Sequence, residues 1–122
     1  MTQMETVFDD QPVVDNRVIE RLRRDMAEET DPIIESYVES IFEFIEQFDN
    51  RGDLAPEDDL HRWAHTIKSA AKGIGAMRVA HLAEEIESAY RDRIRIDLDS
   101  YLASLKIELD RALQRLQDIL SH

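Results

Sequence analysis

Two histidines and two lysines recur at helical spacing in the middle of the chain. Intervals of four, three and four residues put them on one face of a helix: His61, His65, Lys68 and Lys72. A neutral imidazole can accept a phosphoryl group near neutral pH, because its pKa lies close by. Lysines one and two turns along can offset the charge that such a group brings. The stripe therefore suits an anion, and a phosphoryl group is the expected one.

The distribution of charge marks the same segment. The 122 residues contain 27 Asp and Glu against 15 Lys and Arg, which gives a net charge of −12. Residues 60–83 contain no acidic residue, and they include four cations: Arg62, Lys68, Lys72 and Arg78. Acidic helical proteins usually spread carboxylates along every polar face. The gap therefore identifies residues 60–83 as a candidate site.

Composition and motifs exclude several classes of function. The net charge argues against non-specific binding to nucleic acid or to an anionic membrane, since both need a basic surface. No apolar run approaches the roughly 20 residues of a membrane span, and the N-terminus lacks the order of a signal peptide. We therefore expect a cytoplasmic protein. The lack of cysteine excludes thiolate chemistry. Because there is no glycine-rich phosphate loop, no ATP-dependent kinase activity is expected.

Helical periodicity and capping residues predict the elements that position the stripe. Asp15 is the expected N-cap of a first helix, and Asp31 followed by Pro32 predicts the start of a second. The predicted helices cover residues 16–29, 32–48, 56–73, 76–93 and 97–120. This order predicts an all-α fold, an antiparallel up-down four-helix bundle with an extra N-terminal capping helix. Residues 1–14 are expected to be a loosely ordered lead-in to a single domain, residues 15–122.

Apolar residues predict which faces are buried. The last predicted helix has a regular stripe, which a coiled-coil dimer or the bundle core could use: Leu102, Leu105, Leu109, Ala112, Leu116 and Ile119. The stripe spans barely three heptads, so we expect core and a monomer. Most aromatic residues are also expected in the core, with one or two exposed near His65: Tyr37, Phe42, Phe44, Phe48 and Trp63. His81 is expected to face solvent.

Two runs of residues resemble the histidine-containing phosphotransfer (HPt) family. The first is HTIKSAAKGIGA, residues 65–76, and the second is HLAEEIE, residues 81–87. The family pattern has a His, a Lys three residues on, a small residue next and a Gly ten residues after the His. A Leu- and Ala-rich helix that ends in Glu or Gln follows. The helix order expected here also matches the family's bundle.

The resemblance implies a phosphorelay intermediate. His65 would accept a phosphoryl group from an aspartyl phosphate on a response-regulator receiver domain and pass it to an Asp of another receiver. Lys68 would stabilise the phosphoryl oxygens. Glu87 would accept a hydrogen bond from the imidazole and leave the other ring nitrogen free to attack. The expected partners are receiver domains and a hybrid sensor histidine kinase. The receiver would supply Mg²⁺, so no cofactor is expected on this chain.

The resemblance gives other residues supporting roles. Glu84 and Lys72 could assist at the site, and Gly75 would let two helices turn tightly beside it. His61 and Arg78 could also contact a receiver, although the family motif does not require them. Ser69 departs from the family pattern, which has Gly after the Lys to make room for the receiver. Because Ser is small, access should survive, while the rate or the choice of partner could change.

Simpler readings of the same residues stay open. A histidine on a polar helix face is most often only solvated, and Lys68 could be an ordinary surface lysine. His61 and His65 could chelate zinc, although no third ligand is specified and the lysines would repel a cation, so no metal is expected. The alternative function is a non-catalytic helical adaptor or regulator that binds a receiver or kinase without phosphotransfer.

Overall fold

The computed structural model describes residues 11–49 and 57–121. Within these ranges the chain forms one 3-10 turn and five α-helices, with these bounds: α2 Asn16–Met26, the 3-10 turn η1 Ala27–Glu29, α3 Thr30–Asp49, α4 Glu57–Ile74, α5 Met77–Asp92 and α6 Leu98–Leu120. The helices predicted from periodicity are all present. The lead-in before residue 11 and the side chain of Phe48 lie outside what is described.

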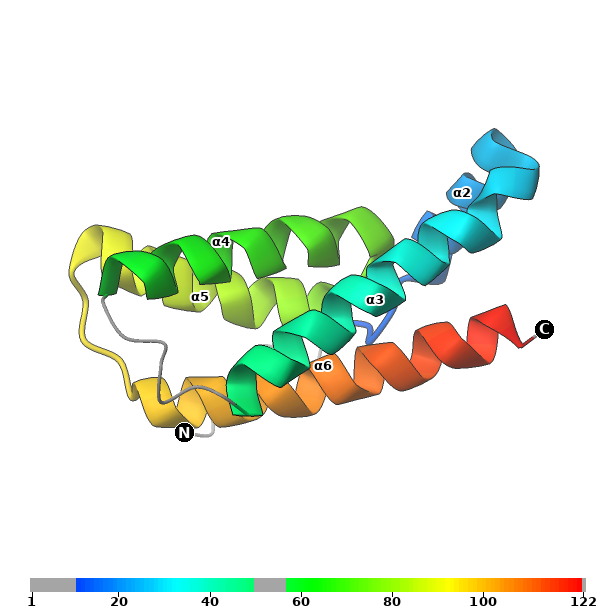
Figure 1. Cartoon of the computed structure of the whole chain (residues 1–122). Helices are drawn as coiled ribbons and strands as arrows, with labels where there is room; N and C mark the ends of the chain where they lie inside the picture. Colours follow the sequence, from blue (N-terminus) through cyan, green and yellow to red (C-terminus); the bar gives the residue numbers. More distant parts are fainter. Residues whose placement is uncertain (1–10, 50–56, 122) are drawn as a thin grey trace.

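The four long helices form the predicted bundle. Helices α4 and α5 make a closely packed antiparallel hairpin, while α6 packs against both α3 and α5 (Figure 1). Helix α2 contacts α3 and α4 at the end of the molecule opposite the α5–α6 loop. The prediction of a four-helix bundle with an extra N-terminal helix is therefore confirmed. Among the described residues, no helix is long and apolar enough to cross a membrane.

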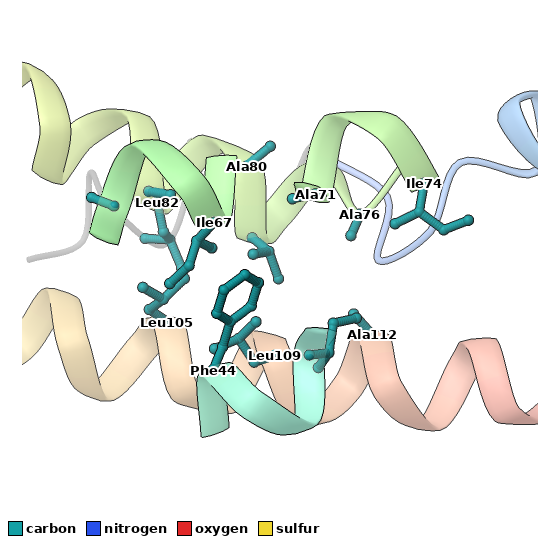
Figure 2. Close-up of a cluster of buried hydrophobic side chains, with 14 of the residues drawn as sticks. Phe44, Ile67, Ala71, Ile74, Ala76, Ala80, Leu82, Leu105, Leu109 and Ala112 are labelled. Carbon is teal, nitrogen blue, oxygen red and sulfur yellow. The ribbon is translucent and has the colours of Figure 1, made fainter. Parts of the chain in front are cut away.

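The bundle core lies between the α4–α5 hairpin and the pair α3 and α6. Phe44 of α3 points into the space between Ile67 of α4 and Leu109 of α6 (Figure 2). The stripe of α6 is buried inside this one chain, with exposed fractions from 0% to 4%: Leu102, Leu105, Leu109, Ala112 and Leu116. The intramolecular core therefore uses the face that a coiled-coil dimer would need.

The first predicted helix ends earlier than expected. The chain leaves the α-helical conformation at Ala27, where φ is 47°, and continues as the 3-10 turn. Helix α3 then begins at Thr30, so the expectation that Asp31 is an N-cap outside the helix is wrong, and Asp31 lies in the first turn. The physical reason is Thr30, which is 1% exposed and donates a hydrogen bond from Oγ1 to the Leu22 carbonyl. This contact ties the start of α3 to α2.

Helices α2 and α3 each expose one large apolar side chain. Met26 of α2 is 41% exposed, and Phe42 of α3, expected in the core, is 47% exposed. Phe42 directly follows buried Ile41, and one residue rotates a side chain by about 100° around the helix. Tyr37 is half-buried, while Phe44 and Trp63 are buried as predicted.

The turn between α4 and α5 depends on Gly75, whose φ is +83°. This left-handed conformation strains any residue with a Cβ. A Cβ at Gly75 would also lie 3.0 Å from Val18 Cβ and 3.2 Å from the Asp15 carbonyl oxygen. The Asp15 amide donates to the Gly75 carbonyl at 2.8 Å, and the Asp15 carboxylate caps α2 as predicted, accepting from the Arg17 amide. The start of α2 is thereby held against the hairpin turn.

Candidate functional site

Helix α4 carries His65 on its outer face. Ala64 and Ile67 are fully buried, so the two residues between them, His65 and Thr66, turn outward. The His65 side chain is 58% exposed. The exposure of the imidazole follows from the same periodicity that buries the apolar face of α4.

The His65 ring is held from the neighbouring helix. Glu87 of α5 places Oε2 at 2.5 Å from His65 Nδ1, and its side chain is 8% exposed. An ionised carboxylate can only accept a hydrogen bond, so this contact fixes the ring hydrogen on Nδ1. In the neutral ring Nε2 then carries the lone pair, and it has no protein partner among the residues described. The arrangement presents an oriented, accessible nucleophile.

Lys68 completes the contacts of Glu87. Its ammonium forms an ion pair with Glu87 Oε1 and lies 3.7 Å from Glu84 Oε1. Burial alone would raise the pKa of Glu87, but the hydrogen bonds from Lys68 and His65 outweigh it and hold that pKa below its ordinary value. The bond to Glu87 in turn raises the pKa of Lys68. Both groups are therefore charged at neutral pH.

Two further predicted residues extend this cluster along α4 and α5. Lys72 Nζ lies 3.7 Å from Glu84 Oε1, so Glu84 lies between two ammonium groups. Ser69 is exposed one turn after His65, and no hydrogen-bond partner for its hydroxyl occurs in the described part of the chain. Glu87 thus contacts the imidazole directly, and successive ion pairs link Lys68, Glu84 and Lys72 to it. Ser69 lies one turn from His65 on the same helix.

Two predicted residues lie away from the imidazole. Gly75 forms the hairpin turn, but ten residues at 1.5 Å each put it about 15 Å along α4 from His65, so the turn is not beside the site. Arg78 lies about 13 Å along α5 from Glu87 by the same arithmetic. Its Nε donates to the Gln11 carbonyl at 2.7 Å, and Nη1 lies 3.9 Å from Glu108 Oε2. Arg78 therefore joins the N-terminal segment to the bundle.

The two remaining histidines of the central segment differ in their surroundings. His61 is half-buried one turn before His65 and lines a groove at the α5–α6 end of the bundle. His81, predicted to face solvent, is only 27% exposed, and its Nε2 lies 3.7 Å from Glu85. No group of three residues able to hold a metal occurs among the described residues, so no third ligand joins His61 and His65 there.

Two charged residues near these contacts escaped the sequence reasoning. Arg91 follows Glu87 by one turn of α5; its pKa is raised, chiefly by a hydrogen bond to Asp92 and further by the charges of Glu87 and Glu84. The four-residue spacing from Glu87 could have revealed it. Glu108 is 1% exposed within the apolar stripe of α6 and pairs with Arg111 at 2.8 Å. Its position as an acidic residue within the otherwise apolar stripe of α6 could have revealed Glu108 in the sequence.

Comparisons with known proteins agree with this fold. The family model described as the Hpt domain matches residues 32–119. The crystal structure of histidine-containing phosphotransfer protein B (HptB) from Pseudomonas aeruginosa PAO1 is similar, with a TM-score of 0.79 and 18% sequence identity. The match covers 90% of this chain and 96% of that one. No curated protein matches the sequence.

Proposed function

The chain belongs to the Hpt domain family, and from that premise we propose that His65 carries a phosphoryl group between receiver domains. Membership of this family supports a role in histidine phosphotransfer within a phosphorelay. In our proposal His65 takes the group from an aspartyl phosphate on one response-regulator receiver and gives it to an Asp of another. A receiver of a hybrid sensor histidine kinase is the proposed donor. The observation that carries the proposal is the contact of His65 Nδ1 with Glu87, which orients an exposed imidazole.

The transfer needs no proton to move. The Nε2 lone pair of neutral His65 attacks phosphorus, and the bond between phosphorus and the aspartyl oxygen breaks. The electron pair leaves with the aspartate, which regains its carboxylate charge. The ring becomes cationic, and the Glu87 carboxylate on Nδ1 stabilises that charge. Transfer to the second receiver reverses these steps. The chain contributes positioning and charge, while Mg²⁺ is expected on the receiver.

Lys68 is proposed to stabilise the phosphoryl oxygens. Its ammonium is already in the site, paired with Glu87 and near Glu84. A phosphoryl group on Nε2 would add a second anion within reach of the same ammonium. Lys72, one turn further, would add a weaker, more exposed charge. Because the hydrogen bond to Glu87 raises the pKa of Lys68, that ammonium stays charged at neutral pH, and the product would be stabilised without any change in its protonation.

Phosphotransfer to this chain tests the proposal. Receiver domains encoded in the same genome are labelled on aspartate, mixed with the protein and Mg²⁺, and the chain is assayed for acid-labile phosphate. We expect label on the wild type and on His61→Gln, and none on His65→Gln. His61 is the matched control because it is an imidazole on the same helix, one turn earlier. Label retained by His65→Gln would refute the proposal. Binding of a receiver without any label would establish the non-catalytic adaptor instead.

A further inference from the structure

A groove lies beside the site, at the end of the bundle where α5 passes into α6. Its volume is about 720 Å³, and residues of α4, α5 and the following loop line it, chiefly His61, Tyr90, Arg91, Arg93, Ile94 and Arg95. The loop lies at the end of the bundle opposite α2 (Figure 1). We refer to the groove lined by these residues as the arginine groove.

Two cations of the arginine groove, Arg93 and Arg95, are available to a partner. Arg93 and Arg95 are exposed, and neither forms an ion pair with another described residue. The acids of the same loop have other contacts. Asp92 accepts from Arg91 Nε at 3.3 Å, and Asp97 caps α6 by accepting from the Ser100 amide and hydroxyl. The loop thus presents positive charge on a chain whose net charge is −12.

The arginine groove also has an apolar component. Ile94 is 59% exposed, more than the other exposed large apolar side chains of the described residues. It lies between Arg93 and Arg95, and half-buried Tyr90 lines the same groove. An exposed apolar side chain flanked by cations favours a partner segment that is both acidic and apolar.

The arginine groove is continuous with the phosphotransfer site. His61 precedes His65 by one turn of α4, and Arg91 follows Glu87 by one turn of α5, so each is about 6 Å along its helix from the site. The charge of Arg91 is close enough to that of Glu87 to affect its own pKa. A protein domain that brings a phosphoaspartate to His65 must therefore lie at the edge of this groove.

From these observations we propose that the arginine groove is a second docking contact for the receiver domain and takes an acidic segment of it that carries an apolar side chain. This inference rests on the proposed function. The arginines would speed encounter and orient the receiver, and Ile94 would pack against the apolar side chain. Nucleic acid is a poor occupant, because its long phosphate backbone would meet the acidic remainder of the chain.

Charge reversal tests the groove separately from the chemistry. The variant is Arg93→Glu with Arg95→Glu, and the matched control is Arg23→Glu with Arg24→Glu on α2, which changes net charge equally at the opposite end. Transfer is measured from the receiver that labels the wild type fastest and from phosphoramidate, a small donor that needs no docking. We expect the groove variant to lose about tenfold or more in kcat/KM with the receiver at low salt, because rim charges steer association. The loss should shrink at high salt.

Further measurements distinguish an effect of the groove from an effect of net charge or of the chemistry at His65. The rate with phosphoramidate should stay within about twofold of wild type in both variants, and the α2 control should keep most of its rate with the receiver. Ile94→Ser should weaken receiver binding several-fold at any salt concentration. Equal losses in the groove variant and the α2 control would show a net-charge effect and overturn the proposal, as would an unchanged rate in the groove variant.

A measurement of binding affinity distinguishes a failure of the docking proposal from a failure of the phosphotransfer proposal. The affinity of the same receiver domains for wild type, the groove variant and His65→Gln is measured by titration calorimetry. We expect His65→Gln to bind like wild type and the groove variant to bind about tenfold more weakly. If no receiver labels the chain but binding still depends on the groove, the docking proposal stands and the transfer proposal fails. Equal affinity of wild type and the groove variant would refute the docking proposal.

Discussion

Two buried carboxylates, Glu87 on α5 and Glu108 on α6, occupy comparable positions with different partners. Each is nearly inaccessible and each contacts a cation. Glu87 contacts the exposed imidazole of His65, whereas Glu108 pairs with Arg111 and lies near Arg78, two guanidinium groups that only donate hydrogen bonds. Burial of an acid therefore does not identify a functional site by itself. What distinguishes Glu87 is a partner that is accessible and has a ring nitrogen left to react.

The sharpest test of this comparison is Glu87→Ala. We expect transfer to His65 to fall about 100-fold, because the ring loses the acceptor that fixes its hydrogen on Nδ1 and stabilises its cationic form. The measurement is the single-turnover rate from a phosphorylated receiver, alongside a thermal melt that checks for a folded bundle. Glu108→Gln is the control and should keep its transfer rate within about twofold. A folded Glu87→Ala protein with the wild-type rate would remove the distinction between the two acids.

The reciprocal prediction concerns stability. Glu108→Ala should lower the free energy of unfolding by about 2 kcal/mol, since it leaves Arg78 with one fewer partner and opens a space in the stripe of α6. Arg111 is half-exposed and can be solvated, which limits the loss. Urea denaturation followed by circular dichroism gives the value. Glu108→Leu fills the space without a charge and should recover most of the lost free energy of unfolding. If it does not, the acid itself is required.

Lys68 tests whether the charge next to Glu87 matters for transfer. Lys68→Ala should slow transfer about tenfold, the value of one charge-assisted hydrogen bond of roughly 1.5 kcal/mol. The control is Lys72→Ala, whose ammonium is more exposed and reaches only Glu84, so the loss there should stay below about threefold. Single-turnover rates from the same receiver compare the two variants. Equal losses of rate in the two variants would mean that the contact of Lys68 with Glu87 does not matter for transfer.

The pH dependence of stability should reveal the depressed pKa of Glu87. A carboxyl group whose folded pKa lies below its ordinary value of 4.5 contributes stability that is present above that value and is lost as pH falls through the folded pKa. The stability difference between wild type and Glu87→Gln should therefore be constant near neutral pH and shrink below about pH 4.5. Urea titrations at several pH values measure it. A difference that grows as pH falls would contradict the ion pair with Lys68.

The smallest effect is expected at Ser69. Ser69→Gly should speed transfer from the receiver by no more than about threefold, because it removes a small side chain one turn from His65. It should also cost about 0.5 kcal/mol of stability, since Gly is the poorer helix former. Ser69→Leu serves as the opposite change and should slow transfer. Equal rates for Gly and Leu would show that the receiver does not approach this part of α4.

Much of the fold and of the candidate site could be predicted from the sequence, because local rules determine those parts. The stripe of α4 buries Ile67 and exposes His65 by periodicity alone, and Asp15 caps α2 as its residue type suggests. The start of α3 was missed because a tertiary contact, the hydrogen bond from Thr30 to the Leu22 carbonyl, starts the helix two residues earlier than the Asp31-Pro32 pair indicates.

Long-range partners were the part that sequence reasoning could not supply. The pairing of Arg78 with the Gln11 carbonyl joins residues 67 positions apart, and no spacing rule indicates it. The arginine groove depends on how the loop after α5 folds, with Asp97 turned into the cap of α6. The pairing of His65 with Glu87 was implied by family resemblance, and the structure places His65 Nδ1 2.5 Å from Glu87 Oε2.

The short connection between α4 and α5 also bears on the order of folding. Only 22 residues separate His65 from Glu87, and the turn at Gly75 joins their helices directly. Closing so small a loop costs little chain entropy, and contacts of low sequence separation form early. The imidazole and its carboxylate therefore both lie within one local hairpin, and their contact does not use α6. Core substitutions in α6 should then reduce how many molecules are folded while each folded molecule keeps an intact nucleophile.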